Sequence, residues 1–87
     1  MAIDWDIVRR FRGRKRNQPH RVFAKLLGGI PGIEIIKKSG SRRVIRYESR
    51  IVLVYDVPHG SKDGVDPAAV ETLVEFIDVT FVEGVKK

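Results

Sequence analysis

The sequence predicts an α+β domain with an α-β-β-β-α core, in which a three-stranded antiparallel sheet carries helices on one face. Apolar residues recur at helical spacing near residues 22–27 and 70–77. Between these two stripes lie three short runs rich in β-branched residues. The links between the runs are short, which favours antiparallel neighbours in a meander. Two helices can cover one face of such a sheet and leave the other face open.

A basic N-terminal arm is expected to precede this core, so the chain divides into an arm at residues 1–17 and one compact domain at residues 18–87. Ile3 and Ile7 lie at helical spacing, which indicates a short amphipathic helix. The run Arg9–Arg16 then places six positive charges in eight residues. These charges repel one another and Gly13 weakens a helix, so we expect the run to be mobile until an anion neutralises it.

The helix boundaries follow from capping residues. Asn17 as the cap and Pro19 in the first turn predict the start of a helix, and the glycine pair at 28–29 predicts its end. Asp66 as the cap and Pro67 at the first position predict the last helix in the same way.

Strands are predicted at Ile33–Lys37, Arg43–Tyr47 and Ile51–Val57. The third run is the most apolar, so it is expected to be the central strand. Residues 79–85 are again apolar and β-branched, and they form either an edge strand or a contact with a partner.

Composition excludes several classes of function. The 87 residues contain no cysteine, so neither a disulfide nor a thiolate metal site is expected. The longest clearly apolar run, Ile51–Tyr55, is far too short to span a bilayer, and the N-terminus does not resemble a signal peptide. We therefore expect a soluble cytoplasmic protein that needs no cofactor and does not contact a membrane.

Charge is the most informative bulk property. The net charge is +6, but residues 1–50 hold 14 Lys and Arg against 4 Asp and Glu, whereas residues 51–87 hold 3 against 7. Such asymmetry is typical of a basic face that binds nucleic acid, although a merely solvated surface is the simpler alternative.

The candidate nucleic-acid-binding residues form two clusters and one loop position. A Ser-Gly turn in the second cluster can present backbone N–H groups and the Ser41 hydroxyl to a phosphate, although it can equally be a plain turn. The candidates are Arg9, Arg10, Arg12, Arg14, Lys15, Arg16, Lys37, Lys38, Ser41, Arg42, Arg43, Arg46, Arg50 and Lys62. The expected ligand is RNA, with DNA as the alternative.

Aromatic residues and histidines are the remaining candidates. Tyr47, Phe11 and Trp5 can either stack on unpaired bases or pack in the core, and packing is favoured for the last two. His20 is expected to be an exposed side chain. His59 follows the third strand in a polar loop and is the candidate catalytic residue, because imidazole can transfer protons near neutral pH. Two separated histidines form no metal site.

Residues 24–77 resemble HicA-type toxins, which are small mRNA interferases of toxin–antitoxin pairs. The matching segments are Lys25-Leu26-Leu27, Lys37-Lys38-Ser39-Gly40-Ser41, Val57-Pro58-His59, and Lys62-Asp63 followed by the last helix. The resemblance covers a little over half of the chain. It implies a fold similar to double-stranded-RNA-binding domains and an acidic antitoxin-like protein partner.

One departure from the family affects the expected chemistry. In the family a histidine that acts in RNA cleavage follows the Gly-Ser pair, but here Arg42 occupies that position. Arginine stays protonated and does not serve as an ordinary base, although it can bind phosphate. Three interpretations stay open: an RNA-binding protein without catalysis, an active metal-independent endoribonuclease that uses His59, and a DNA-binding or protein-interaction module.

Overall fold

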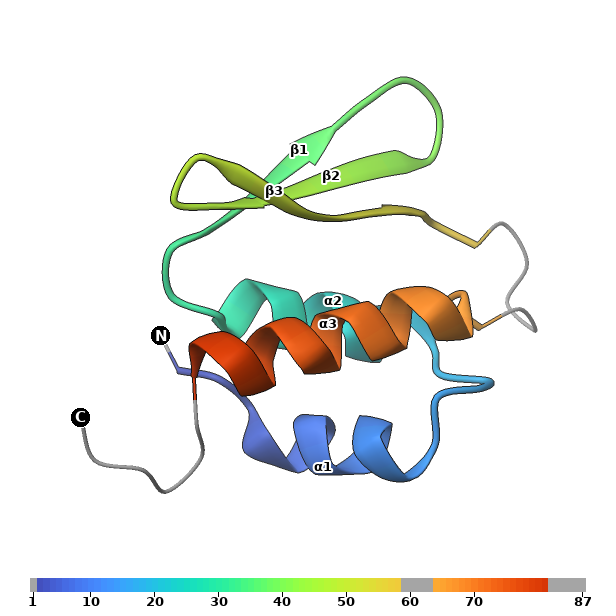
Figure 1. The fold of residues 1–87 in the computed structure, drawn as a ribbon. Coiled ribbons are helices and arrows are strands. Elements are labelled where there is room, and N and C mark those ends of the chain that lie inside the picture. The colour runs from blue at the N-terminus through green and yellow to red at the C-terminus, as the bar shows by residue number, and fades with distance from the viewer. Residues whose placement is uncertain (1, 59–63, 82–87) are drawn as a thin grey trace.

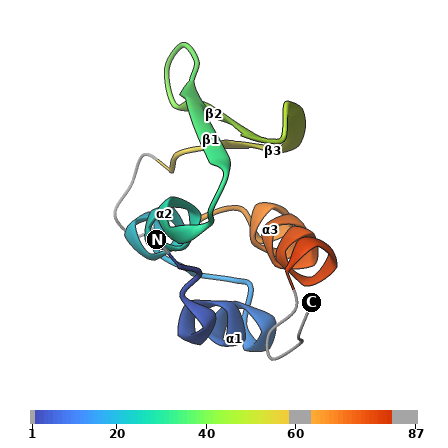
Figure 2. The same ribbon diagram turned by 90° about the vertical axis from the view of Figure 1, so that its left-hand side faces the viewer.

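The computed structural model describes residues 2–58 and 64–81. Its elements are, in chain order, α1 (Trp5–Gly13), α2 (His20–Gly29), β1 (Ile33–Lys37), β2 (Arg42–Tyr47), β3 (Arg50–Asp56) and α3 (Pro67–Thr80). The strands form one antiparallel sheet in the order β1-β2-β3. The sheet lies above α2 and α3, and α1 lies beneath these two helices (Figures 1 and 2). This is the α+β arrangement, with helices on one face of the sheet, that the sequence predicts.

Strand β2 is the middle strand of the sheet. β1 pairs with β2 from Ile33 opposite Tyr47 to Lys37 opposite Arg43, and β2 pairs with β3 on its other side. The expectation that the third strand is central is therefore wrong. In a meander with short links the second strand is the middle one, and β3 lies at an edge of the sheet. Leu53 and Tyr55 of β3 are buried toward the helices, whereas Ile51 and Val54 are exposed.

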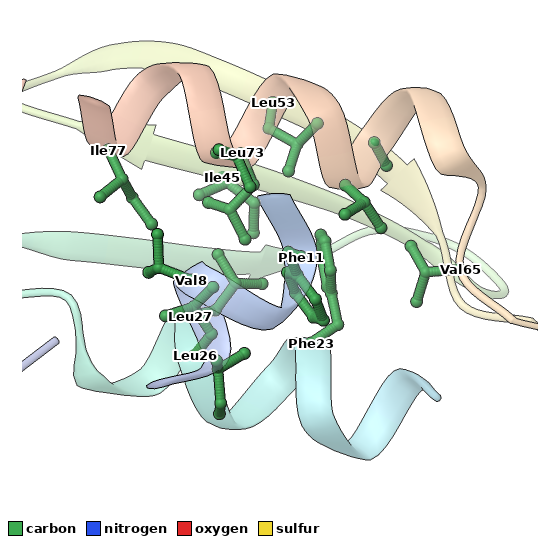
Figure 3. Close-up of a cluster of buried hydrophobic side chains, with 14 of the residues drawn as sticks. Val8, Phe11, Phe23, Leu26, Leu27, Ile45, Leu53, Val65, Leu73 and Ile77 are labelled. Carbon is green, nitrogen blue, oxygen red and sulfur yellow. The ribbon is translucent and has the colours of Figure 1, made fainter. Parts of the chain in front are cut away.

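The core lies between the sheet and the helices and continues down to α1. Its fully buried members come from α1, α2, β2, α3 and the segment before α3. They include Val8, Phe11, Phe23, Leu26, Leu27, Ile45, Val65, Leu73 and Ile77, and Leu53 of β3 is almost fully buried (Figure 3). The rings of Phe11 and Phe23 stack with their centroids 6.2 Å apart. Phe11 is thus a core residue, as the sequence favours, and Trp5 packs partly buried against the same core.

Helix α1 joins the core instead of standing apart as an arm. Val8 and Phe11 are completely buried, and Arg12 pairs with Asp78 of α3. The physical reason is that the sheet covers only one side of α2 and α3, so the apolar face of α1 buries their other side. Local ion pairs also reduce the charge repulsion, since Arg9 lies 2.6 Å from Asp6. The ordered helix accordingly continues to Gly13.

The capping prediction holds for α3 but not for α2. Asp66 Oδ1 accepts a hydrogen bond of 2.9 Å from the Ala68 N–H, and Pro67 is the first helical residue. Asn17, however, lies in a turn with a φ of 60°, and Pro19 occupies the cap position. Proline has no polar side chain, so the first N–H groups of α2 have no side-chain acceptor.

Candidate nucleic-acid interface

Both predicted basic clusters contribute to one end of the molecule. The connection between α1 and α2, the β1–β2 turn and the first turns of α2 and α3 all lie at the right-hand end of Figure 1. Two backbone hydrogen bonds of 2.9 Å connect these segments to the neighbouring chain. The Val57 N–H donates to the carbonyl oxygen of Ser41, and the Val65 N–H donates to the carbonyl oxygen of Gln18. We name this region the basic end and define it by Arg14, Lys15, Arg16, Arg21, Lys37, Lys38, Arg42 and Arg43.

Most cations of the basic end have no acidic neighbour. Within the described part of the chain Arg14, Arg16, Arg21, Lys37, Lys38 and Arg43 form no ion pair with a carboxylate. Arg42 is the exception, with its Nε 3.3 Å from Asp56 Oδ1. An unpaired surface cation keeps its full charge for a ligand, so this end attracts anions.

Several predicted binding residues lie elsewhere. Arg46 lies on the open face of the sheet with its Nε 3.1 Å from Glu34 Oε1, and Arg50 begins β3 at the opposite end of the sheet. Arg9, Arg10 and Arg12 belong to α1.

Two predicted residues, His59 and Lys62, lie outside the described residues. The ring of Tyr47 contacts Phe76 and Phe81 edge to face, with centroids 5.3 Å and 5.8 Å away. Tyr47 therefore packs against other aromatic rings of the protein, which leaves it poorly placed to stack on a base.

The β1–β2 turn holds Arg43 in place. Gly40 has a φ of +67°, which favours glycine, and no atom lies within 4 Å of where its Cβ would be. The guanidinium of Arg43 donates to the carbonyl oxygens of Gly40 and Arg42 at 3.4 Å and 3.2 Å. The turn is thus open toward solvent, and its carbonyl oxygens accept hydrogen bonds from Arg43, a cation that forms no ion pair with a described carboxylate.

His20 and Tyr55 form a contact that the sequence interpretation missed. Lys37, Arg43 and Tyr55 occupy one cross-strand row of the sheet. His20, the first residue of α2, places Nε2 3.0 Å from the Tyr55 hydroxyl oxygen. The expectation that His20 is simply exposed is therefore wrong, because its ring is half-buried against the sheet. No local pattern signals this pair, since it depends on strand register and helix packing.

The environment keeps this pair neutral. Burial lowers the pKa of His20 below its usual 6.5, and the nearby positive charge of Arg43 lowers it further. Burial raises the pKa of Tyr55, while Arg43 acts in the opposite direction. Near neutral pH the arrangement is a neutral imidazole, hydrogen-bonded to a protonated phenol, in the field of a guanidinium ion.

Comparisons with known proteins leave the chain without an assigned family. No protein-family model matches the sequence, and neither a curated protein nor a solved structure is significantly similar to it. The resemblance to HicA-type toxins therefore stays a prediction. Among the described residues no helix is long and apolar enough to cross a membrane, and no three His, Cys, Asp or Glu side chains gather as metal ligands would.

Proposed function

We propose that this protein binds RNA through its basic end. The observation that carries the proposal is the distribution of paired and unpaired cations. Arg9, Arg12, Arg42 and Arg46 lie beside carboxylates, whereas most cations around the β1–β2 turn and the α1–α2 connection do not. Phosphate groups are the ligands that such a cluster of lysine and arginine side chains prefers.

Binding of this kind depends steeply on salt, because each neutralised phosphate releases counterions. If about five phosphates of a single strand contact the basic end, affinity falls roughly 100-fold between 50 mM and 200 mM salt. The test is a titration of labelled single- and double-stranded RNA, and of duplex DNA, at both salt concentrations. Affinity that is independent of salt contradicts the proposal, and a preference for duplex DNA favours the DNA-binding alternative.

Matched charge variants locate the interface. The double variant Lys37→Ala/Lys38→Ala removes two cations from the basic end. The control Arg10→Ala/Arg50→Ala removes the same charge from α1 and from the far end of the sheet, and all four side chains are exposed. We expect the first pair to weaken RNA binding at least about tenfold more than the second. Equal losses show that only net charge matters and remove the basic end from the proposal.

A second candidate function is metal-independent RNA cleavage, which the contact between His20 and Tyr55 favours. In this mechanism the His20 imidazole takes the proton of a ribose 2′-hydroxyl. The 2′-oxygen then attacks phosphorus and the bond to the 5′-oxygen breaks, and that oxygen receives the Tyr55 proton. Arg43 stabilises the charge that develops on the phosphate. Proton transfer from the imidazolium to the phenolate restores both groups and leaves a 2′,3′-cyclic phosphate.

Cleavage is tested with EDTA present and with the variants His20→Asn and His59→Ala. Cyclic phosphate products that disappear only in the first variant support the His20 mechanism, and loss only in the second restores His59 as the catalytic residue. Intact RNA that is nevertheless bound identifies a binding protein without this activity. An acidic antitoxin-like partner in the cytoplasm fits the same surface, and its carboxylates would compete with RNA there.

A further inference from the structure

A groove follows the outer edge of the sheet, between β3 and α3. Neighbouring hollows along these two elements share residues, since Val52, Phe76 and Thr80 line two of them and Thr72 joins them to a third. Figure 2 shows β3 directly above α3. The hollows therefore lie next to one another along β3 and α3, and we name them together the β3–α3 groove.

The strand that borders the groove has an unpaired edge. In the sheet order β1-β2-β3, the edge of β3 that faces away from β2 has no strand partner in the described part of the chain. Unpaired N–H and C=O groups on such an edge can accept an additional strand. The seven residues of β3 extend for about 23 Å. The fourteen residues of α3 extend for about 21 Å. The strand and helix thus match in length over the whole groove.

The part of the groove beside Val52 and Phe76 is mainly apolar. The register shift at Ile45/Arg46 leaves Val52 without a partner on β2, and its side chain lies partly buried against the core beside Phe76. Val79 on α3 also lines the groove and is 84% exposed, although it is a large apolar residue. A partner that covers it removes apolar surface from water, which favours binding.

The lining of the groove is acidic, in contrast to the net charge of +6 on the whole protein. Its charged residues are Glu48, Asp56, Asp66, Glu75 and Arg50. Asp56 pairs with Arg42, and Asp66 caps α3. Glu75 forms no ion pair with a described residue, so its charge remains available to an occupant.

We propose that the β3–α3 groove binds an extended, basic peptide segment of a partner protein, which adds to β3 as a fourth antiparallel strand. The unpaired edge supplies the backbone hydrogen bonds, Val52, Phe76 and Val79 contact the peptide side chains that point toward α3, and the carboxylate of Glu75 beside them favours a lysine or arginine in the peptide. The groove meets the basic end at Asp56 and Asp66 and extends from there along β3 and α3 to Glu48 and Arg50. Its acidic lining is opposite in charge to the basic end, so the groove and the RNA interface bind different partners.

The probe is a seven-residue peptide of alternating lysine and valine, titrated into the ¹⁵N-labelled full chain. We expect chemical-shift changes confined to β3 and α3, and slower hydrogen exchange at the outward-facing amides of β3. Two versions of the peptide with methylated backbone nitrogens test the strand pairing. One is methylated at the backbone nitrogens of the lysines and the other at those of the valines. Only one of these methylation patterns blocks the peptide edge that faces β3, so we expect one version to bind and the other to fail.

Charge reversal on α3 provides the matched variants. Glu75 lines the groove, whereas Glu71 is exposed on the same helix and is absent from the lining. We expect Glu75→Lys to weaken peptide binding at least about fivefold and Glu71→Lys to change it little. The proposal is overturned if the peptide produces no shift changes at millimolar concentration, if the changes lie outside the groove, or if both N-methylated peptides bind equally. Equal effects of the two reversals overturn the assigned role of the acidic lining.

Discussion

The imidazole of His20 lies 3.0 Å from the hydroxyl oxygen of Tyr55, a residue 35 positions further along the chain. This contact links the first turn of α2 to the edge strand β3, and the cross-strand register places Arg43 opposite Tyr55. It is the only histidine contact in the described part of the chain, because His59 lies outside that part. The pair therefore provides both a stability test and a chemical test.

Tyr55→Phe removes one side of this hydrogen bond while keeping the ring. The Tyr55 ring also packs edge to face on Phe23, with centroids 4.8 Å apart, so the fold should be preserved. We expect the free energy of unfolding to fall by about 1 kcal/mol, as measured by urea denaturation. RNA binding should change little, and any cleavage should decrease strongly. Unchanged cleavage would exclude Tyr55 as the proton donor.

The titration of His20 should respond to Arg43. Burial is the larger cause of the lowered pKa and Arg43 is the smaller, so Arg43→Gln should raise the midpoint only part of the way toward 6.5. The measurement is an NMR titration of the imidazole signals. A midpoint at or above 6.5 in the unmodified protein would contradict the half-buried environment.

The same pKa shift predicts how stability depends on pH. In the unfolded chain His20 binds a proton near pH 6.5, whereas in the folded protein it does so only at lower pH. The unfolded state thus binds more protons below pH 6.5, so the His20 contribution to stability is present above that pH. It is lost as the pH falls from 6.5 through the folded pKa. Between pH 7.5 and pH 5 the free energy of unfolding, measured by denaturation, should decrease less for His20→Asn than for the unmodified protein.

Core substitutions test whether α1 belongs to the folded domain. Phe11 is fully buried and stacks on Phe23, so Phe11→Ala should cost about 3–5 kcal/mol, a large part of the stability of a small domain. Phe11→Leu should cost roughly 1 kcal/mol, which keeps the effect measurable if the alanine variant does not fold. Arg10→Ala on the same helix is the exposed control. A cost near zero at Phe11 would show that residues 1–17 are a separate arm.

The adjacent glycines at the end of α2 should respond in opposite directions. No atom lies within 4 Å of a Cβ built on Gly28, so Gly28→Ala should stabilise the helix by about 0.4–1 kcal/mol. A Cβ on Gly29 would lie 2.5 Å from the backbone oxygen of Ala2, so Gly29→Ala should destabilise the protein by about 1–3 kcal/mol. Thermal unfolding of both variants measures the contrast, and a stabilising Gly29→Ala would contradict the close packing of the N-terminal segment on α2.

The correct and incorrect sequence predictions differ in how far apart the interacting residues are. The start of α3 was predictable because Asp66 caps a helix that begins at the next residue. The cap of α2 was not, because Asn17 and Pro19 suit both a capped helix start and a left-handed turn followed by an uncapped one. Phe11 in a basic run suggested an arm, and only the second face of α2 and α3 explains its burial.

For the candidate site, the sequence determined which residues carry positive charge and that they form two clusters. It also determined the α+β class, the order of the elements and the short antiparallel links, because periodicity and turn residues act over a few neighbouring positions. The tertiary structure alone decided which cations pair with carboxylates, that β2 and not β3 is central, and that His20 meets Tyr55. These outcomes depend on strand register and on packing between distant segments, which no local pattern contains.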